Sequence, residues 1–133
     1  IAVFPGQGSQ TIGMGMQVSK TIKSAKNVLD EVDDALNFKL SEVMKEGDEE
    51  TLRLTKNAQP ALMATGIAIV RAIEEISGKN ISQIVSHSAG HSLGEYSALA
   101  CSGVIKFYDT IKLLKIRGRA MQNAVPKNEG GMI

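Results

Sequence analysis

A serine with a glycine two residues away on each side is the residue of this chain best placed to act as a nucleophile. Residues 90–94 read Gly-His-Ser-Leu-Gly, the Gly-x-Ser-x-Gly pattern of a nucleophile elbow with Ser92 at its centre. Glycines are needed on both sides because the backbone passes too close there for a side chain. A helix that starts at such a serine points free backbone N–H groups at developing negative charge. We therefore expect Ser92 to be a nucleophile and the N–H of Leu93 to stabilise an oxyanion.

Ser88 is the rival serine in the same segment. It has Ser86 two residues before it and Gly90 two residues after it, so only Ser92 has a glycine on both sides. We expect Ser88 to be an ordinary strand residue.

A serine hydroxyl also needs a base, and histidine is the usual one. The chain has 2 histidines. Neighbouring side chains diverge in an elbow, which disfavours His91, and elbow enzymes take their histidine from later in the chain, which disfavours His87. The general-base histidine is therefore expected to lie outside this chain, with His87 and His91 as the alternatives, and the 133 residues alone are expected to be inactive.

The glycine-rich start of the chain, Phe-Pro-Gly-Gln-Gly-Ser-Gln at 4–10, does not fit a nucleotide-binding loop. Thr11 stands where Gly-x-Gly-x-x-Gly needs its third glycine, and no glycine loop leads into Lys20. A loop after the first strand of a parallel sheet lies beside the elbow, because both leave the carboxyl ends of strands. Gln7 is therefore expected to donate an amide N–H to the oxyanion.

These residues must be positioned by strands and helices that alternate along the chain. Apolar runs predict strands over 1–4 and 81–89, the second leading into the elbow. Apolar spacing of three and four predicts helices over 16–36, 95–101 and 107–123. A further helix is predicted from an N-cap at Asn57, with Pro60 in its first turn, to Ser77 before Gly78. The alternation predicts an α/β fold, a parallel sheet flanked by helices.

Composition narrows the class of protein. The 133 residues are 43% hydrophobic and 22% charged, which is ordinary for one globular domain, and the net charge of +1 gives no reason to expect nucleic acid or a membrane surface as partner. The lone Cys101, and the lack of a signal peptide or a membrane-spanning stretch, predict a cytoplasmic protein. No metal or cofactor is required by the chemistry above.

Four blocks in order carry a resemblance to a known family. They are Phe4–Gln10, Gln59-Pro60-Ala61-Leu62, Gly90-His91-Ser92-Leu93-Gly94-Glu95-Tyr96 and Arg117-Gly118. Together they resemble the malonyl-CoA:acyl-carrier-protein transacylases of fatty acid biosynthesis. The resemblance implies an α/β-hydrolase-like acyltransferase core. Residues 1–133 would form part of its large subdomain, with the ferredoxin-like small subdomain and the rest of the core following. The chain lacks an initial Met and stops after Gly130-Gly131-Met132-Ile133, so both ends are expected to be cut.

The resemblance also implies roles for residues. Ser92 would carry the acyl ester, Gln7 and Leu93 would line the oxyanion hole, and Arg117 would bind the malonyl carboxylate. His91 would contact the substrate, and the catalytic histidine would lie in a later motif. The substrates would be malonyl-CoA and acyl carrier protein. Ser86-His87-Ser88 departs from the family's apolar strand, and no role is derived for Glu95 or Tyr96.

Arg117 has its own chemical rationale, because a guanidinium holds a planar carboxylate through two parallel hydrogen bonds. The alternative is a surface charge on an amphipathic helix. The stretch from Lys106 to Lys127 is rich in basic residues, and such a face would suit an acidic carrier protein and the phosphates of coenzyme A, although solvated lysines need no partner.

Two other functions are also compatible with these residues. A serine hydrolase of the esterase or lysophospholipase kind would use the same elbow with water as the acceptor. A non-catalytic carrier-binding module would need no histidine.

Overall fold

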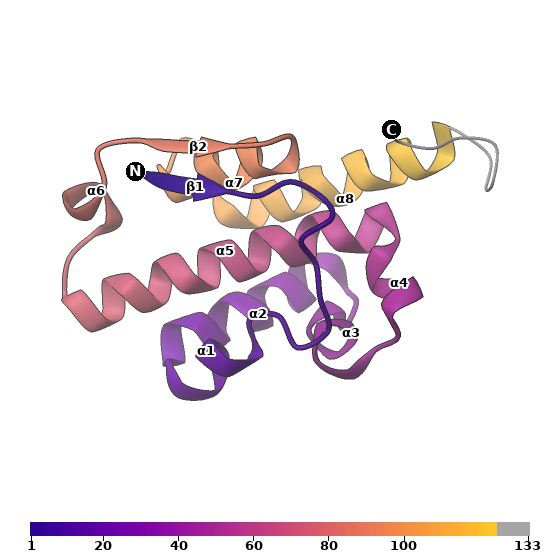
Figure 1. The fold of residues 1–133 in the computed structure, drawn as a ribbon, viewed down its shortest axis with the longest axis horizontal. Helices are drawn as coiled ribbons and strands as arrows, with labels where there is room; N and C mark the ends of the chain where they lie inside the picture. Colours follow the sequence, from indigo (N-terminus) through magenta and orange to yellow (C-terminus); the bar gives the residue numbers. More distant parts are fainter. Residues whose placement is uncertain (125–133) are drawn as a thin grey trace.

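A long helix runs through the middle of the structure, a computed structural model that describes residues 1–124. This helix, α5 (Thr55–Ser77), lies between α1 (Met16–Thr21), α2 (Lys23–Leu36) and α3 (Leu40–Glu46) on one side and the strands with α7 (Leu93–Cys101) and α8 (Phe107–Ala124) on the other (Figure 1). It ends where predicted, since Gly78 adopts a left-handed φ of 66°. No helix within residues 1–124 is both long and apolar enough to cross a membrane.

The sheet is parallel, as expected, but short. Within residues 1–124 it consists of β1 (Ala2–Phe4) and β2 (Ser88–Gly90), paired in register from Ala2 opposite Ser88 to Phe4 opposite Gly90. The prediction of a strand over residues 81–89 is therefore wrong except at its end, because the strand begins only at Ser88. Residues Ile81–Ile84 form the helix α6 because Asn80 and Gln83 make a reciprocal capping box at its start. The fold is thus α/β with more helix than the sequence pattern predicted.

Two of the predicted helices have clearly different bounds, and a third, α7, begins two residues earlier than predicted, at Leu93. The expected helix over 16–36 is broken at Ile22, whose backbone is extended (φ −117°, ψ 121°) and whose N–H closes α1 on Val18. The apolar spacing of residues 16–36 continues across Ile22, so the periodicity of the sequence did not reveal the break between α1 and α2. The next helix begins at Thr55 rather than after a cap at Asn57, because the buried Asn57 side chain donates to the Thr51 carbonyl instead. Pro60 consequently lies inside α5 and not in its first turn.

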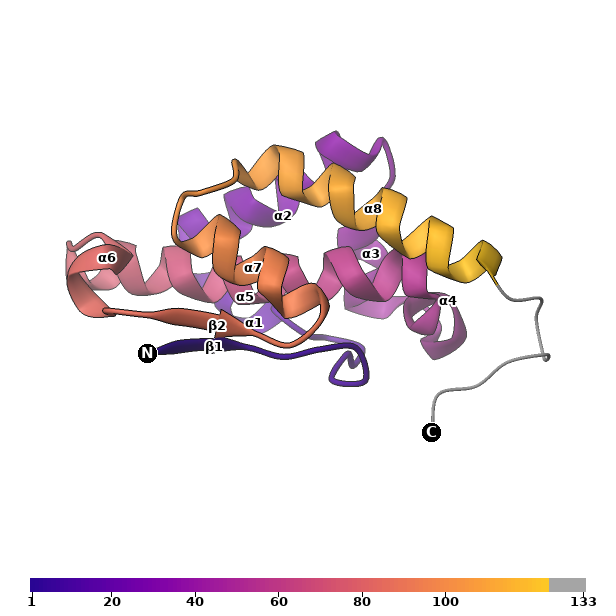
Figure 2. The same ribbon diagram turned by 90° about the horizontal axis from the view of Figure 1, so that it is seen from above.

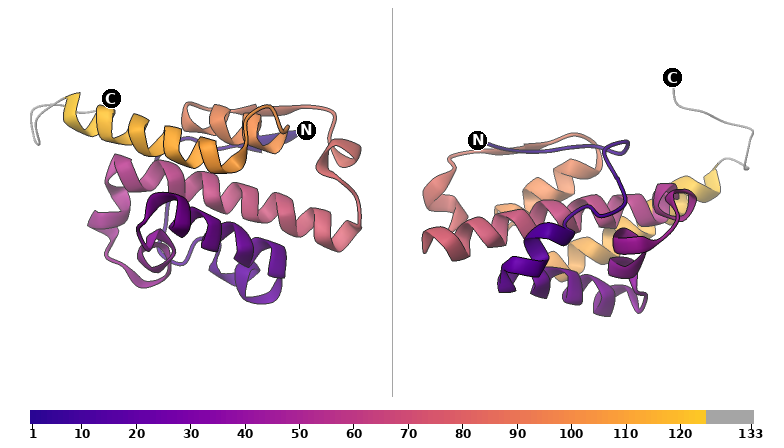
Figure 3. Two further views of the ribbon diagram at one scale, coloured as in Figure 1. Left: turned by 180° about the vertical axis from the view of Figure 1, so that it is seen from behind. Right: turned by 60° about the horizontal axis from the view of Figure 1, so that its bottom comes forward.

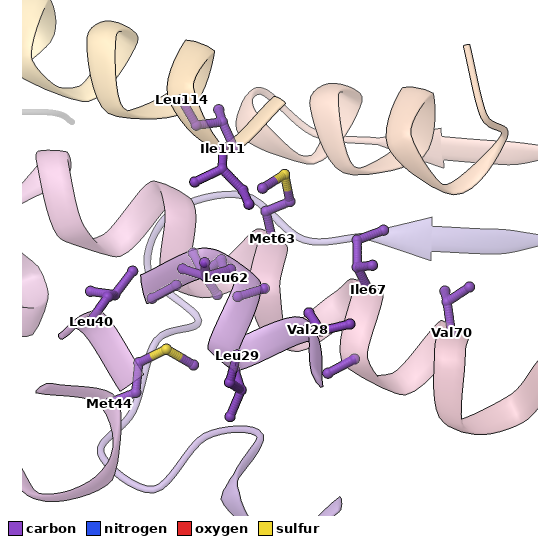
Figure 4. Packing of buried hydrophobic residues seen from close by; sticks show 14 of the residues in the cluster. Val28, Leu29, Leu40, Met44, Leu62, Met63, Ile67, Val70, Ile111 and Leu114 are labelled. Atoms are coloured by element: carbon purple, nitrogen blue, oxygen red, sulfur yellow. The ribbon is translucent and has the colours of Figure 1, made fainter. Parts of the chain in front are cut away.

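The core is built around α5 from helices on both of its sides. The short helices α3 and α4 (Glu49–Arg53) close the end of the core near the start of α5. Figure 4 shows side chains of α2, α3, α5 and α8 meeting in one apolar cluster. Its members include Val28, Leu29, Leu40, Met44, Leu62, Met63, Ile67, Ile111 and Leu114.

The helix α8 crosses α5 at a residue without a side chain. A Cβ placed on Gly118 would lie 2.7 Å from the Cα of Lys56 and 2.7 Å from the carbonyl oxygen of Thr55. The two backbones are therefore in direct contact, and α8 lies at an angle to α5 in Figure 2 and beside it in the left view of Figure 3. This contact fixes where the residues next to Gly118 lie, Arg117 among them.

One face of the molecule carries an apolar groove of about 400 Å³ between β1, α5 and α6. Val3 on β1 is 74% exposed there, and Ile69, Ile73 and Ile84 line the other walls. Within residues 1–124, β1 pairs with β2 alone, so its second edge is unpaired. Apolar side chains in this groove are incompletely covered by the described residues.

The α5–α8 crossing predicts that Gly118→Ala destabilises the protein. The added methyl must push two backbones apart, which should lower the free energy of unfolding by about 1–3 kcal/mol in equilibrium denaturation. Gly66→Ala is the matched control because it brings the same gain in helix propensity. Its methyl meets the side chain of Phe4, at 3.0 and 3.2 Å, and no backbone, so we expect a smaller loss of stability there. Equal stability of the two variants would contradict a backbone contact at Gly118.

Candidate active site

The turn between β2 and α7 has the geometry of a nucleophile elbow. Ser92 has φ 56° and ψ −111°, a conformation that residues with a side chain rarely adopt. A Cβ on Gly90 would overlap the backbone of Gly94, and one on Gly94 would press on the carbonyl oxygens of Phe4 and Pro5. Both glycines flanking Ser92 are therefore required by close backbone packing, as the sequence pattern predicted.

The strained turn leaves the Ser92 hydroxyl available for chemistry. A serine that precedes a helix commonly caps it, but the Ser92 side chain makes no capping hydrogen bond and is exposed. Leu93 begins α7, so its N–H has no acceptor within the helix. A nucleophilic oxygen and a free backbone donor thus belong to adjacent residues at the positive end of one helix.

Arg117 reaches Ser92 from α8. Its Nη2 donates to the Ser92 Oγ at 3.0 Å, and its Nη1 donates to the Oε1 of Gln59 at 2.7 Å. The guanidinium carbon lies 5.8 Å from the centre of the Tyr96 ring. Three helices, α5, α7 and α8, therefore meet at one guanidinium, which lies beside the candidate nucleophile Ser92 rather than on an outer helix surface.

Gln7 lies in the loop after β1, and this loop runs beside the elbow as expected. The N–H of His91 donates to the Phe4 carbonyl at 3.1 Å, which ties the two segments together. The Gln7 Nε2 donates to Thr55 Oγ1 at 3.2 Å, and within residues 1–124 no hydrogen bond joins Gln7 to Ser92. A primary amide has two N–H groups, so Gln7 retains a second donor.

Neither histidine of the described residues contacts the Ser92 hydroxyl. The exposed His91 ring lies against Gly6, and the Nδ1 of the exposed His87 lies 3.0 Å from the Ser86 Oγ. The polar segment Ser86-His87 precedes β2 and is exposed, which explains why it tolerates polar residues. Within residues 1–124, the hydroxyl of Ser92 therefore has a cation beside it but no base.

The other nucleophilic side chains are less suited to react. Ser88 is a residue of β2, as predicted, and its hydroxyl donates to the Ala98 carbonyl at 3.3 Å. Burial raises the pKa of the Cys101 thiol, which keeps it in the unreactive protonated form at neutral pH.

The basic residues of α8 do not form one face directed at Ser92. Lys115 turns to the other side of the crossing, where its Nζ donates to Asn57 Oδ1 at 3.3 Å and lies 5.1 Å from the Phe38 ring. Burial, and then the nearby charges of Arg119 and Lys56, lower the pKa of Lys115. Lys112 lies over its neighbour Tyr108, and Lys127, like the chain end at 130–133, falls outside the described residues.

Sequence reasoning left two contacts of Arg117 without a role. Gln59 and Tyr96 both belong to the blocks that carried the family resemblance, but spacing alone did not connect them with Arg117. A signal for Gln59 was present, because a glutamine in an apolar helix that is expected to be buried needs hydrogen-bond partners.

Comparison with known proteins identifies the family. The sequence profile described as "acyl transferase domain" matches residues 1–133 of this chain. The chain belongs to the acyl transferase domain family. The malonyl CoA-acyl carrier protein transacylase of Bacillus subtilis (strain 168) is 48% identical to this chain over 130 residues, which make up 98% of the chain and 39% of that protein.

Solved structures agree with this assignment. The acyl-carrier-protein S-malonyltransferase of Bartonella henselae superposes with a TM-score of 0.89 at 53% identity, over 92% of this chain and 39% of that one. A malonyl-transacylase in complex with its type II polyketide synthase acyl carrier protein superposes with a TM-score of 0.86 at 44% identity, over 95% and 40%. The chain thus spans about two fifths of the length of these relatives.

The backbone of Ser92 predicts an unusual order of stability among substitutions. Glycine accepts a positive φ without strain, so Ser92→Gly should be more stable than Ser92→Ala by about 1 kcal/mol in equilibrium denaturation. Both variants lose the hydroxyl and its bond to Arg117 equally. Ser102, with an ordinary φ of −79°, is the matched control, and there the alanine variant should be the more stable one. The same order at both sites would mean that Ser92 is unstrained.

Proposed function

We propose that this chain is the amino-terminal part of a cytoplasmic enzyme that transfers a malonyl group from malonyl-CoA to acyl carrier protein, with Ser92 as the acyl carrier. The observation that carries the proposal is the hydrogen bond of 3.0 Å between the Arg117 guanidinium and the Ser92 hydroxyl. A group attached to that hydroxyl would begin beside a cation that matches a carboxylate. The names of the relatives, malonyl CoA-acyl carrier protein transacylases, point to the same reaction.

The reaction has two half-reactions that share one acyl-enzyme. Ser92 Oγ attacks the thioester carbonyl carbon while its proton passes to a general base. The carbon–sulfur bond then breaks, and coenzyme A leaves as a thiol that takes up that proton. In the second half, the phosphopantetheine thiol of acyl carrier protein gives its proton to the base and attacks the serine ester, the carbon–oxygen bond breaks, and the base passes that proton to Ser92 Oγ.

The charge that develops on the thioester oxygen is stabilised by donors near the elbow. Leu93 offers its N–H at the positive end of α7, and Gln7 offers the amide N–H that Thr55 does not engage. His91, exposed at the same turn, is a proposed substrate contact.

Arg117 selects the acyl group. In the acyl-enzyme the malonyl carboxylate is separated from the ester carbonyl by one methylene, so it lies within reach of a guanidinium that already contacts Oγ. In the free protein Arg117 Nη2 donates a hydrogen bond to Ser92 Oγ. In the acyl-enzyme Nη2 donates to the malonyl carboxylate instead, in a charge-assisted hydrogen bond. A neutral acyl group makes no such bond, and an esterase acting on neutral substrates would gain nothing from an arginine at this place.

The remaining parts of the site are proposed to lie beyond residue 133. The chain spans 39% and 41% of the length of two curated relatives, and neither described histidine reaches Ser92. We assign residues 1–133 to part of the large, α/β-hydrolase-like subdomain. The general-base histidine, the rest of the core and a ferredoxin-like subdomain would come from the remaining sequence. The apolar groove beside β1 supports this division, because further chain would cover it.

Acylation of Ser92 is directly testable in the full-length protein. Incubation with malonyl-CoA alone should add one malonyl group to the peptide that contains Ser92, because the first half-reaction needs no carrier protein. Mass spectrometry of a quenched digest measures the adduct, which Ser92→Ala should abolish and Ser88→Ala should retain. An adduct with the opposite dependence would place the nucleophile at Ser88, and release of free malonate without transfer would indicate a hydrolase.

Replacement of Arg117 should lower malonyl transfer far more than acetyl transfer. A buried carboxylate left without its partner costs on the order of 3–5 kcal/mol, so Arg117→Ala should lower kcat/KM for malonyl transfer by roughly 100-fold or more. Acetyl transfer should fall little, and Arg117→Lys should recover only part of the malonyl rate because lysine lacks the two-pronged geometry. The measurement is the malonyl-to-acetyl ratio of kcat/KM. A ratio that stays constant in Arg117→Ala would make Arg117 an ordinary helix charge.

A further inference from the structure

Gln59 is a fully buried polar side chain at the α5–α8 crossing. It is 0% exposed, and both ends of its amide are engaged. Oε1 accepts from Arg117 Nη1 at 2.7 Å, and Nε2 donates to the Met121 sulfur at 3.3 Å. Burying an amide among apolar helices is costly unless its groups are paired, so this residue is placed for its contacts.

We propose that Gln59 is a positioning residue that sets acyl selectivity by holding Arg117 in the orientation that presents Nη2 to the acyl group on Ser92. The inference rests on the function proposed above. It assigns to Gln59 no contact with substrate, only the control of the group that makes that contact.

The direction of the amide is determined by its surroundings. A guanidinium has donors only, so the amide oxygen must face Arg117 and the NH₂ must face away. The Met121 sulfur accepts one N–H on that other side and keeps the amide from turning over. With Nη1 anchored, the planar guanidinium can rotate little, and Nη2 stays directed at Ser92.

A neutral acceptor suits this role better than a charged one. A carboxylate at position 59 would hold Arg117 equally well but would pair with its charge, and the malonyl carboxylate would then compete with a permanent partner. The glutamine amide orients the cation and leaves its charge for the substrate.

The structure supplies a matched control on the other side of the crossing. Asn57, 2% exposed, also turns a buried amide oxygen to a cation of α8, Lys115, at 3.3 Å. Both residues lie on α5 two positions apart, and both contacts bridge the same pair of helices. Only Gln59 contacts a cation that also contacts Ser92, namely Arg117. Substitution of Asn57 therefore measures the loss of packing alone, and substitution of Gln59 measures the loss of packing together with the loss of positioning.

The test measures the malonyl-to-acetyl ratio of kcat/KM in the full-length enzyme. Gln59→Leu should lower the ratio about ten-fold, which corresponds to about 1.4 kcal/mol. Gln59→Glu, which keeps shape and acceptor, should lower it at least as much because it neutralises Arg117. Asn57→Leu should change the ratio less than about two-fold, even where its melting temperature falls as far as that of Gln59→Leu.

A double mutant tests whether Gln59 acts through Arg117. In an Arg117→Ala background, Gln59→Leu should leave the ratio unchanged, because no guanidinium remains to be oriented. An unchanged ratio in Gln59→Leu alone, or a further fall in the double mutant, would overturn the inference.

A second readout does not depend on activity. Phenylglyoxal, which modifies arginine side chains, should label Arg117 faster in Gln59→Leu than in wild type or Asn57→Leu, as read by peptide mass. Equal labelling in all three proteins would overturn the positioning role. A wild-type enzyme that loads no malonyl group would overturn the proposed function instead, and the labelling would still report on Gln59.

Discussion

The close approach of three backbone segments at Gly90 and Gly94 is the constraint on which the candidate site depends. The end of β2, the first turn of α7 and the carbonyls after β1 come together where a single added methyl would find no room. That contact forces the sharp turn between strand and helix, and the turn places Ser92 in a strained conformation with its hydroxyl exposed. The strain is sustained because the parallel pairing of β1 with β2 and the packing of α7 leave the turn no other path.

A second backbone contact brings the cation. At Gly118 α8 approaches α5 so closely that the adjacent Arg117 can span from the buried Gln59 to Ser92. The same crossing sends Lys115 to the opposite side, where burial and neighbouring cations lower its pKa. Two cations two residues apart on one helix thus acquire different environments. Side chains two residues apart leave a helix in different directions, so the two cations meet different buried amides of α5. Lys115 contacts Asn57 and Arg117 contacts Gln59.

Local features of the sequence predicted the elbow better than they predicted its surroundings. The Gly-x-Ser-x-Gly pattern and the helix stop at Gly78 depend on short-range sterics, which residue spacing reveals. The break at Ile22 and the helix α6 do not follow from apolar spacing. The break is caused by the extended backbone of Ile22, and α6 begins at the capping box of Asn80, while the apolar spacing stays the same. The contact of Gln59 with Arg117 joins residues 58 positions apart and arises from a helix crossing that no local pattern encodes.

The exposure of Ser92 determines how strongly this arrangement can discriminate between acyl groups. Two unit charges about 4 Å apart interact by about 1 kcal/mol in bulk water, and by about 4 kcal/mol once surrounding protein has lowered the effective dielectric constant to about 20. A guanidinium beside an exposed hydroxyl is therefore a weak selector until the site is closed. The described residues supply the charge and its orientation through Gln59 and Tyr96. Under the proposed function, selectivity for a carboxylate requires a second wall that excludes water and so strengthens the interaction between Arg117 and the acyl group.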